Sequence, residues 1–136
     1  MLRRDTGAFR VNVPRLLDAV QQFMEETFDP PYYLREDIQV NFSPFTAEWN
    51  ITPKGAVGGN NVAAYVTYGT GRANAYRILE DTLNLRDVRI YDTVQDVDGK
   101  EKRVLNSKET TLAQQKQQVI KDAFQKWIWS DPERRE

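Results

Sequence analysis

The 136-residue chain contains no cysteine and no histidine. It can therefore form neither a disulfide framework nor a zinc finger. It also has no thiol nucleophile and no serine–histidine or cysteine–histidine pair for covalent catalysis. Any chemistry would have to use carboxylates, lysine, arginine, tyrosine or backbone groups. We expect no cofactor.

Long apolar runs and an excess of one charge are missing as well. No stretch approaches the ~20 apolar residues that a membrane-spanning helix needs. The arginine-containing N-terminus is not followed by the apolar run of a signal peptide. We therefore expect a cytoplasmic protein without membrane contact. The 19 basic and 20 acidic residues leave a net charge of −1, which excludes a highly basic nucleic-acid tail and an acidic disordered one.

The residues that are present suffice for one folded unit. Hydrophobic residues make up 40% of the chain, and a domain usually takes ~100–200 residues. Residues 1–136 are therefore predicted to form a single domain.

Apolar residues recur at helical spacing in three stretches. These stretches span residues 13–28, 71–85 and 107–129. Asn12 and Thr70 stand where the first two helices would be capped, and Asn106 followed by Glu109 resembles a capping box before the third.

Between these helices the apolar period changes to two. Residues 38–42 and 47–51 alternate as an antiparallel pair with one buried face. Residues 88–94 and 103–106 form a second predicted pair around the turn at Asp98-Gly99, and residues 62–68 are a weaker strand candidate. The predicted fold class is α+β: an antiparallel sheet of about four or five strands with three helices packed on it.

Two glycine-rich segments could bind phosphate, and each has a simpler interpretation. Residues 54–61 lack the Gly-Lys-Ser/Thr ending of a P-loop, so a connecting loop is the alternative. Residues 68–76 place two glycines before a helix and Arg72 in its predicted first turn, where free N–H groups attract an anion. The alternative is a tight turn with Tyr68 and Tyr76 in the core.

The acidic residues form no recognisable catalytic or metal set. The cluster from Asp92 to Glu101 fails as a calcium loop, because Val94 and Leu105 would occupy the first and twelfth positions, which require carboxylates. The neighbouring Glu80 and Asp81 have no partner groups for acid–base catalysis. We therefore expect a segment that is not itself an enzyme and binds no metal.

Charge and aromatic residues concentrate toward the C-terminus. Residues 99–136 contain nine basic and six acidic residues. Lysines of the third predicted helix could follow DNA phosphates, or they could simply form a solvated face. Trp127 and Trp129 lie two residues apart and cannot point the same way, so one is expected in the core and the other near the surface.

Several ordered blocks resemble a known family. The blocks are Thr67-Tyr68-Gly69-Thr70, Asn74-Ala75-Tyr76, Ile78-Leu79-Glu80, Thr82-Leu83-Asn84-Leu85, Asp98-Gly99-Lys100, Val104-Leu105-Asn106, Lys108-Glu109-Thr110, Trp127-Ile128-Trp129 and residues 131–136. They resemble the segment just ahead of the helicase core in large Swi/Snf-like helicase and adenine-specific DNA methylase proteins of bacterial conjugative elements and phages. The helicase motifs and the methylase signature are not in this chain, so neither activity carries over.

The resemblance implies a fragment of a larger multidomain protein: a non-catalytic accessory domain that packs on the helicase core of the parent chain and guides DNA. The residues expected to contact DNA are Lys54, Arg72 and Arg77, with Lys116, Lys121 and Lys126 secondary. The alternative is a protein-interaction or structural module without DNA contact. Its surface would combine the exposed tryptophan with Phe28 and the Tyr32–Tyr33 pair.

Overall fold

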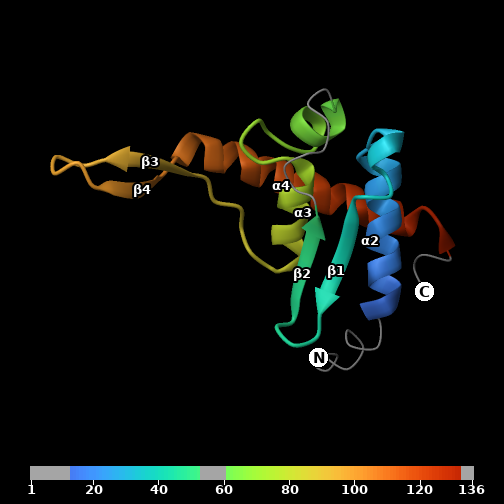
Figure 1. Cartoon of the computed structure of the whole chain (residues 1–136). Helices are drawn as coiled ribbons and strands as arrows, with labels where there is room; N and C mark the ends of the chain where they lie inside the picture. The colour runs from blue at the N-terminus through green and yellow to red at the C-terminus, as the bar shows by residue number, and fades with distance from the viewer. Residues whose placement is uncertain (1–12, 53–60, 133–136) are drawn as a thin grey trace, which may run out of the picture.

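The computed structural model describes residues 13–52 and 61–132 (Figure 1). In chain order, the elements are α2 (Val13–Thr27), a 3₁₀ turn (Tyr32–Leu34), β1 (Gln39–Ser43), β2 (Glu48–Thr52), a π-helical turn (Ala63–Thr67), α3 (Ala75–Leu83), β3 (Tyr91–Gln95), β4 (Glu101–Leu105) and α4 (Ser107–Trp129). The predicted α+β class is confirmed.

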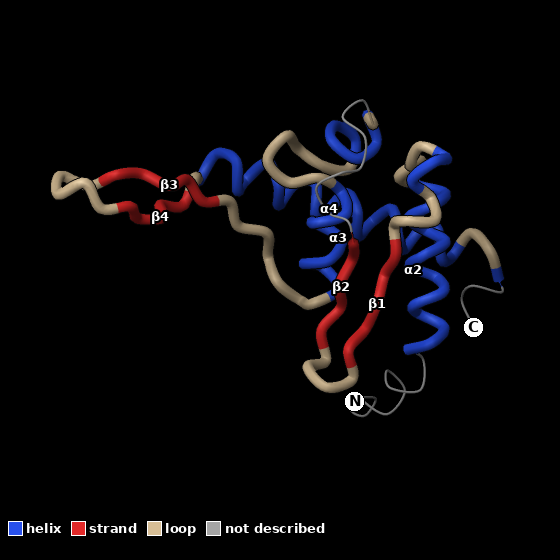
Figure 2. The backbone as a smooth tube through the Cα atoms, viewed as in Figure 1, coloured by secondary structure: helices blue, strands red, loops and turns tan. Residues whose placement is uncertain are grey.

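The strands do not form the predicted single sheet. Within the described residues, β1 pairs only with β2 and β3 only with β4, both antiparallel. Figure 2 shows the two pairs well apart, with β1–β2 in the body and β3–β4 extending away from it. The prediction of four or five joined strands was therefore wrong.

The weaker strand candidate at residues 62–68 is also helical. Its centre forms the π-helical turn, which begins where the Asn61 side chain accepts a hydrogen bond from the Ala64 amide at 3.0 Å. Tyr68 then packs against the ring of Phe28, with centroids 5.4 Å apart. A local side-chain cap and a distant aromatic contact thus override the strand preference of this β-branched and aromatic segment.

Two of the three predicted helices have nearly the expected bounds, and the middle one is shorter. α4 begins at the predicted Asn106 cap, whose side chain accepts from the Glu109 amide. α3 is capped by Asn74 rather than Thr70. Thr70 instead closes a turn, because its hydroxyl accepts from the amides of Arg72 and Ala73. The Asn12 cap proposed for α2 lies outside the described residues.

Side chains of α3 and of its C-terminal cap form hydrogen bonds with the backbone groups on the outer edge of β2. The side-chain amide of Asn84 accepts a hydrogen bond from Trp49 N at 2.7 Å through its oxygen and donates one to Trp49 O at 2.9 Å through its nitrogen, as the backbone of a neighbouring strand would. The Glu80 carboxylate accepts from Ile51 N at 2.7 Å. Since unpaired strand edges invite association with other chains, these contacts close this edge of the sheet.

The outer edge of β1 is closed in the same way by α2. The Gln21 side chain accepts from Val40 N at 3.0 Å and donates to the Ile38 carbonyl at 2.8 Å. Figure 1 shows α2 beside β1 and α3 beside β2. The two-stranded sheet is thus flanked by helices whose polar side chains act in place of a third and a fourth strand.

The extended segment from Arg86 to Ile90 pairs with no strand of residues 13–52 and 61–132, and it lies along α4. The Gln117 side chain accepts from Val88 N at 3.2 Å and donates to the Arg86 carbonyl at 2.8 Å. Gln114 donates to the Val88 carbonyl, and the Thr110 hydroxyl both accepts from and donates to the backbone of Ile90. Thr110, Gln114 and Gln117 lie on one face of α4, because residues separated by three and four share a helix face.

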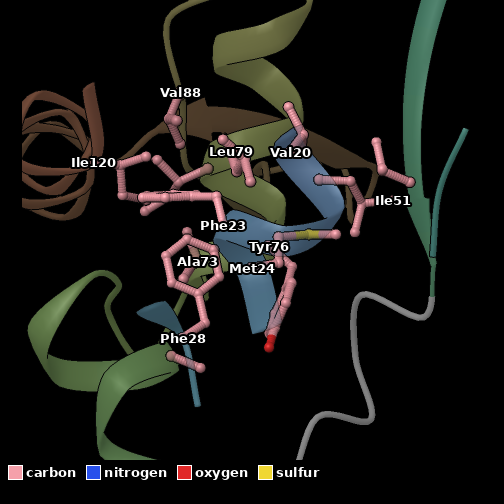
Figure 3. Close-up of a cluster of buried hydrophobic side chains, with 14 of the residues drawn as sticks. Val20, Phe23, Met24, Phe28, Ile51, Ala73, Tyr76, Leu79, Val88 and Ile120 are labelled. Atoms are coloured by element: carbon pink, nitrogen blue, oxygen red, sulfur yellow. The ribbon is translucent and has the colours of Figure 1, made fainter. Parts of the chain in front are cut away.

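The hydrophobic core fills the space between these helices and the β1–β2 sheet (Figure 3). Phe23 of α2 is its aromatic centre, with ring centroids 5.5 Å from Phe28, 5.0 Å from Phe124 and 5.7 Å from Trp127. The buried side chains of α3 and α4 pack around it, so one core holds the three helices together.

Candidate functional site

The most distinctive surface feature is the β3–β4 hairpin, residues 91–105, which we call the arm. Figure 1 shows it projecting from the body at the start of α4. Most of its side chains are exposed on both faces, among them Val94, Val104 and the fully exposed Val97 at the tip. An isolated two-stranded hairpin is only marginally stable in water, so the arm depends on its attachment to the body.

Four side chains, which we call the clamp, fix the root of the arm: Arg72, Arg77, Asp92 and Asn106. The Arg72 guanidinium donates to Asp92 Oδ1 at 2.9 Å and to the Tyr91 carbonyl at 3.0 Å. The Arg77 guanidinium donates to the carbonyls of Arg89 at 3.0 Å and Arg72 at 3.3 Å. Arg72 thus connects the turn before α3 to the first residues of the arm, and Arg77 connects α3 to Arg89 just before the arm.

Asn106, which follows β4 and caps α4, completes the clamp. Its side-chain amide donates to Asp92 Oδ2 at 2.9 Å, and its backbone N–H donates to the Ile90 carbonyl at 2.8 Å. The same side chain caps α4 through the Glu109 amide at 3.0 Å. The hydrogen bonds from Arg72 and Asn106 lower the pKa of Asp92 below its usual 3.8, so this carboxylate is ionised at neutral pH.

The glycine–tyrosine segment before α3 is a close-packed turn, as its simpler interpretation proposed. A Cβ atom at Gly69 would lie 2.1 Å from the Ala64 carbonyl oxygen and 2.8 Å from Ala75 N, so only glycine fits there. Arg72 precedes α3 and is not in its first turn, contrary to the prediction. Tyr76 is fully buried, again as the alternative held.

The structure brings only some of the predicted DNA-contacting residues together. Arg72 and Arg77 lie side by side, but both guanidinium groups are engaged in the clamp. Lys116, Lys121 and Lys126 follow one another at intervals of five residues on α4, and each interval rotates the side chain by about 140° around the helix. Lys121 and Lys126 are exposed and Lys116 is half-buried, so the three lysines form no common face. Lys54 lies outside the described residues.

The aromatic residues proposed for a protein-interaction surface separate into two groups. Phe28 is fully buried, and Trp127 packs against Phe23 and donates from its indole N–H to Glu26 at 3.0 Å. In contrast, Trp129, Tyr32 and Tyr33 are 60%, 85% and 67% exposed. As expected, one of the two C-terminal tryptophans is near the surface and the other packs on the core.

Two titratable side chains of the described residues, Tyr76 and Asp96, bear on acid–base and metal chemistry. Burial raises the pKa of the Tyr76 phenol, which therefore stays protonated near neutral pH. Asp96 at the arm tip accepts from the amides of Asp98 and Lys100, and no group of three or more potential metal ligands occurs in residues 13–52 and 61–132. Among the same residues, no helix is long and apolar enough to cross a membrane.

The sequence pattern predicts the hairpin but not its projection from the body. The sequence of β4 does not alternate between apolar and polar residues. It begins with Glu101, Lys102 and Arg103, so neither face of the hairpin has a continuous apolar row. A strand that packs on a core alternates apolar and polar residues. Three consecutive charged residues therefore indicate a hairpin that is solvated on both sides.

A family model described as a domain of unknown function, DUF8437, matches residues 17–136. No curated protein and no solved structure was found to be similar to the chain.

The clamp predicts a specific pH response of the Asn106 side-chain amide. Because the pKa of Asp92 is lowered in the folded protein, the carboxylate keeps its hydrogen bonds to Arg72 and Asn106 as the pH falls past 3.8, the usual pKa. These hydrogen bonds are lost only as the pH falls through the lowered pKa. In an NMR titration, the Asn106 Nδ2 signals should therefore shift with a midpoint below 3.8. Asp92→Asn should abolish this transition and increase amide exchange in the arm. A midpoint at or above 3.8 in the unsubstituted chain would contradict the clamp.

Proposed function

Because the chain belongs to the DUF8437 family, whose function is unknown, we propose its role from its geometry and its sequence resemblance. It is a non-catalytic accessory domain that packs on the helicase core of a mobile-element DNA helicase/methylase. The proposal requires the coding sequence to continue in frame beyond Glu136 into helicase motifs. A sequence that continues without them contradicts it.

The observation that carries the packing proposal is the exposure of Trp129 in the last turn of α4. Tryptophan and tyrosine are enriched at the energetically important positions of protein interfaces, where their large rings exclude water. Tyr32 and Tyr33, whose rings meet edge-on at 6.0 Å, add a second exposed aromatic group. The best cationic candidates for DNA contact, Arg72 and Arg77, are engaged within the fold. The surface therefore favours a protein partner over a nucleic-acid ligand.

We expect Trp129→Ala to weaken binding to the separately produced polypeptide that carries the helicase motifs by about tenfold or more, the effect of losing an interface hot spot. Isothermal titration calorimetry measures this directly. The substitution should leave the melting temperature within a few degrees of the unsubstituted value, because the indole is largely outside the core.

Phe45→Ala is the matched control for this experiment. Phe45 is another exposed aromatic residue, 97% accessible, but it lies in the β1–β2 turn rather than on α4. Its loss should leave the affinity unchanged. Equal affinities for the unsubstituted chain and Trp129→Ala would refute packing through this end of α4.

The second part of the proposal is DNA guidance, and it rests on the exposed lysines of α4. Lys116, Lys121 and Lys126 are separated by successive rotations of about 140° around the helix, so a passing strand can contact at most two of the three at once. Guidance of this kind is electrostatic and does not read the base sequence. It differs from tight binding in the number of phosphates that it neutralises.

A fluorescence anisotropy titration with single- and double-stranded DNA tests the guidance role. We expect weak, sequence-independent binding at low salt, with a slope of log K against log[salt] no steeper than about −2. Lys121→Gln and Lys126→Gln should each make this slope shallower, whereas the control Gln118→Ala on the same helix should not. Absence of binding to both forms of DNA at low salt would reject guidance and leave the protein-interaction role alone.

A further inference from the structure

We propose that the arm is a dimerisation element: its β3 edge pairs, antiparallel, with the β3 edge of a second copy of this chain. A two-fold axis would pass beside Thr93, giving a four-stranded sheet in the order β4–β3–β3–β4. This goes beyond the packing on a helicase core proposed above, which uses the opposite end of α4.

The hydrogen-bond pattern of the hairpin determines which backbone groups face outward. The Asn106 amide donates to the Ile90 carbonyl at the root, and the Asp96 amide donates to the Lys100 carbonyl at the tip. Alternate residues in an antiparallel pair point toward and away from the partner strand. With the observed register, the N–H and C=O groups of Tyr91, Thr93 and Gln95 therefore point away from β4.

Most of these outward groups are available to a new strand. Within the described residues, the backbone N–H and C=O groups of Thr93 and Gln95 have no hydrogen-bond partner outside the hairpin. The Tyr91 carbonyl accepts from Arg72, but a carbonyl has two lone pairs and can accept a second hydrogen bond. Unlike both edges of β1–β2, which helix side chains close, the β3 edge is left open by the described residues at Thr93 and Gln95.

The two edges of the arm differ in charge. β4 carries three consecutive charged residues, Glu101, Lys102 and Arg103, and charged side chains protect a strand edge from association. β3 carries only one, Asp92, and its carboxylate is paired with Arg72 and Asn106. The remaining residues of β3 include β-branched and aromatic types that favour strands. Pairing is therefore favoured at β3 and disfavoured at β4.

The β3 sequence is complementary to itself in the antiparallel direction. An axis beside Thr93 places the two Thr93 side chains opposite each other, a cross-strand pair that stabilises sheets. The same register places Tyr91 opposite Gln95 of the partner subunit and Val94 opposite Asp92 of the partner subunit. No like charges face each other. The corresponding pairing of β4 about Arg103 would place two guanidinium groups together.

Charge along the arm supports the antiparallel arrangement. The tip carries Asp96 and Asp98 beside one lysine, Lys100, and the root lies beside Arg77 and the exposed Arg89. In the antiparallel register, the tip of each arm reaches the root of the other, so the acidic tip meets the basic root twice in the symmetric dimer. Two paired five-residue strands make a smaller contact than a stable protein interface, so the dimer is expected to be weak.

Sedimentation equilibrium of the full chain over a concentration series tests the pairing. We expect reversible dimerisation that weakens as the salt concentration rises, because tip and root attract electrostatically. Thr93→Pro removes an outward N–H without touching the hydrogen bonds between β3 and β4, and edge positions tolerate proline. This variant should raise the dissociation constant at least tenfold while circular dichroism stays unchanged.

Arg103→Pro is the matched control, because the Arg103 N–H also points outward, but from the β4 edge. It should dimerise like the unsubstituted chain. A monomer at all concentrations, or undiminished dimerisation of Thr93→Pro, would overturn the proposal. Loss of the dimer in both variants would overturn it as well, because dimerisation would then depend on the intact arm and not on the β3 edge in particular. None of these outcomes bears on the Trp129 experiment, so the two proposals can fail separately.

Discussion

The constraint on which this fold depends is the pairing of extended backbone with helix side chains instead of with further strands. Gln21 on one side and Glu80 and Asn84 on the other satisfy the edges of the β1–β2 sheet. Thr110, Gln114 and Gln117 do the same for the segment from Arg86 to Ile90. A buried N–H or C=O without a partner costs about 1–3 kcal/mol. These amide, hydroxyl and carboxylate groups therefore make a small two-stranded sheet compatible with a closed core.

The same arrangement determines where the arm emerges. The extended segment along α4 ends at Ile90, whose backbone is bound by Thr110 and Asn106. Arg72 then holds the next two residues, Tyr91 and Asp92, and Arg77 holds the carbonyl of the preceding Arg89. The root of the arm is thus fixed by two helices, while its strands extend into solvent. This combination of a held root and an open edge suits an element that presents backbone groups to a partner.

Local sequence signals predicted the elements, and distant contacts decided how they join. The periodicities of α2 and α4 and the turn at Asp98-Gly99 lie within single segments, so the helices and both hairpins could be predicted. The partner of Val88 could not, because it is Gln117, 29 residues away on a helix face that appeared to be a run of solvated glutamines. The sequence pattern also predicted Arg72 and Arg77 as phosphate contacts, because their hydrogen-bond partners within the fold lie far away in the sequence. A sequence shows that an arginine is present, but not that carbonyls and a carboxylate already surround it.

Native-state amide hydrogen exchange tests the central claim most directly. Five amides of the extended segments donate to side-chain oxygens of the flanking helices and the α3 cap: those of Val40, Trp49, Ile51, Val88 and Ile90. If these side chains act in place of strands, the five amides should exchange as slowly as the buried amides of α3, through opening of the whole core. Exchange of all five at rates close to those of an unfolded peptide would contradict the account.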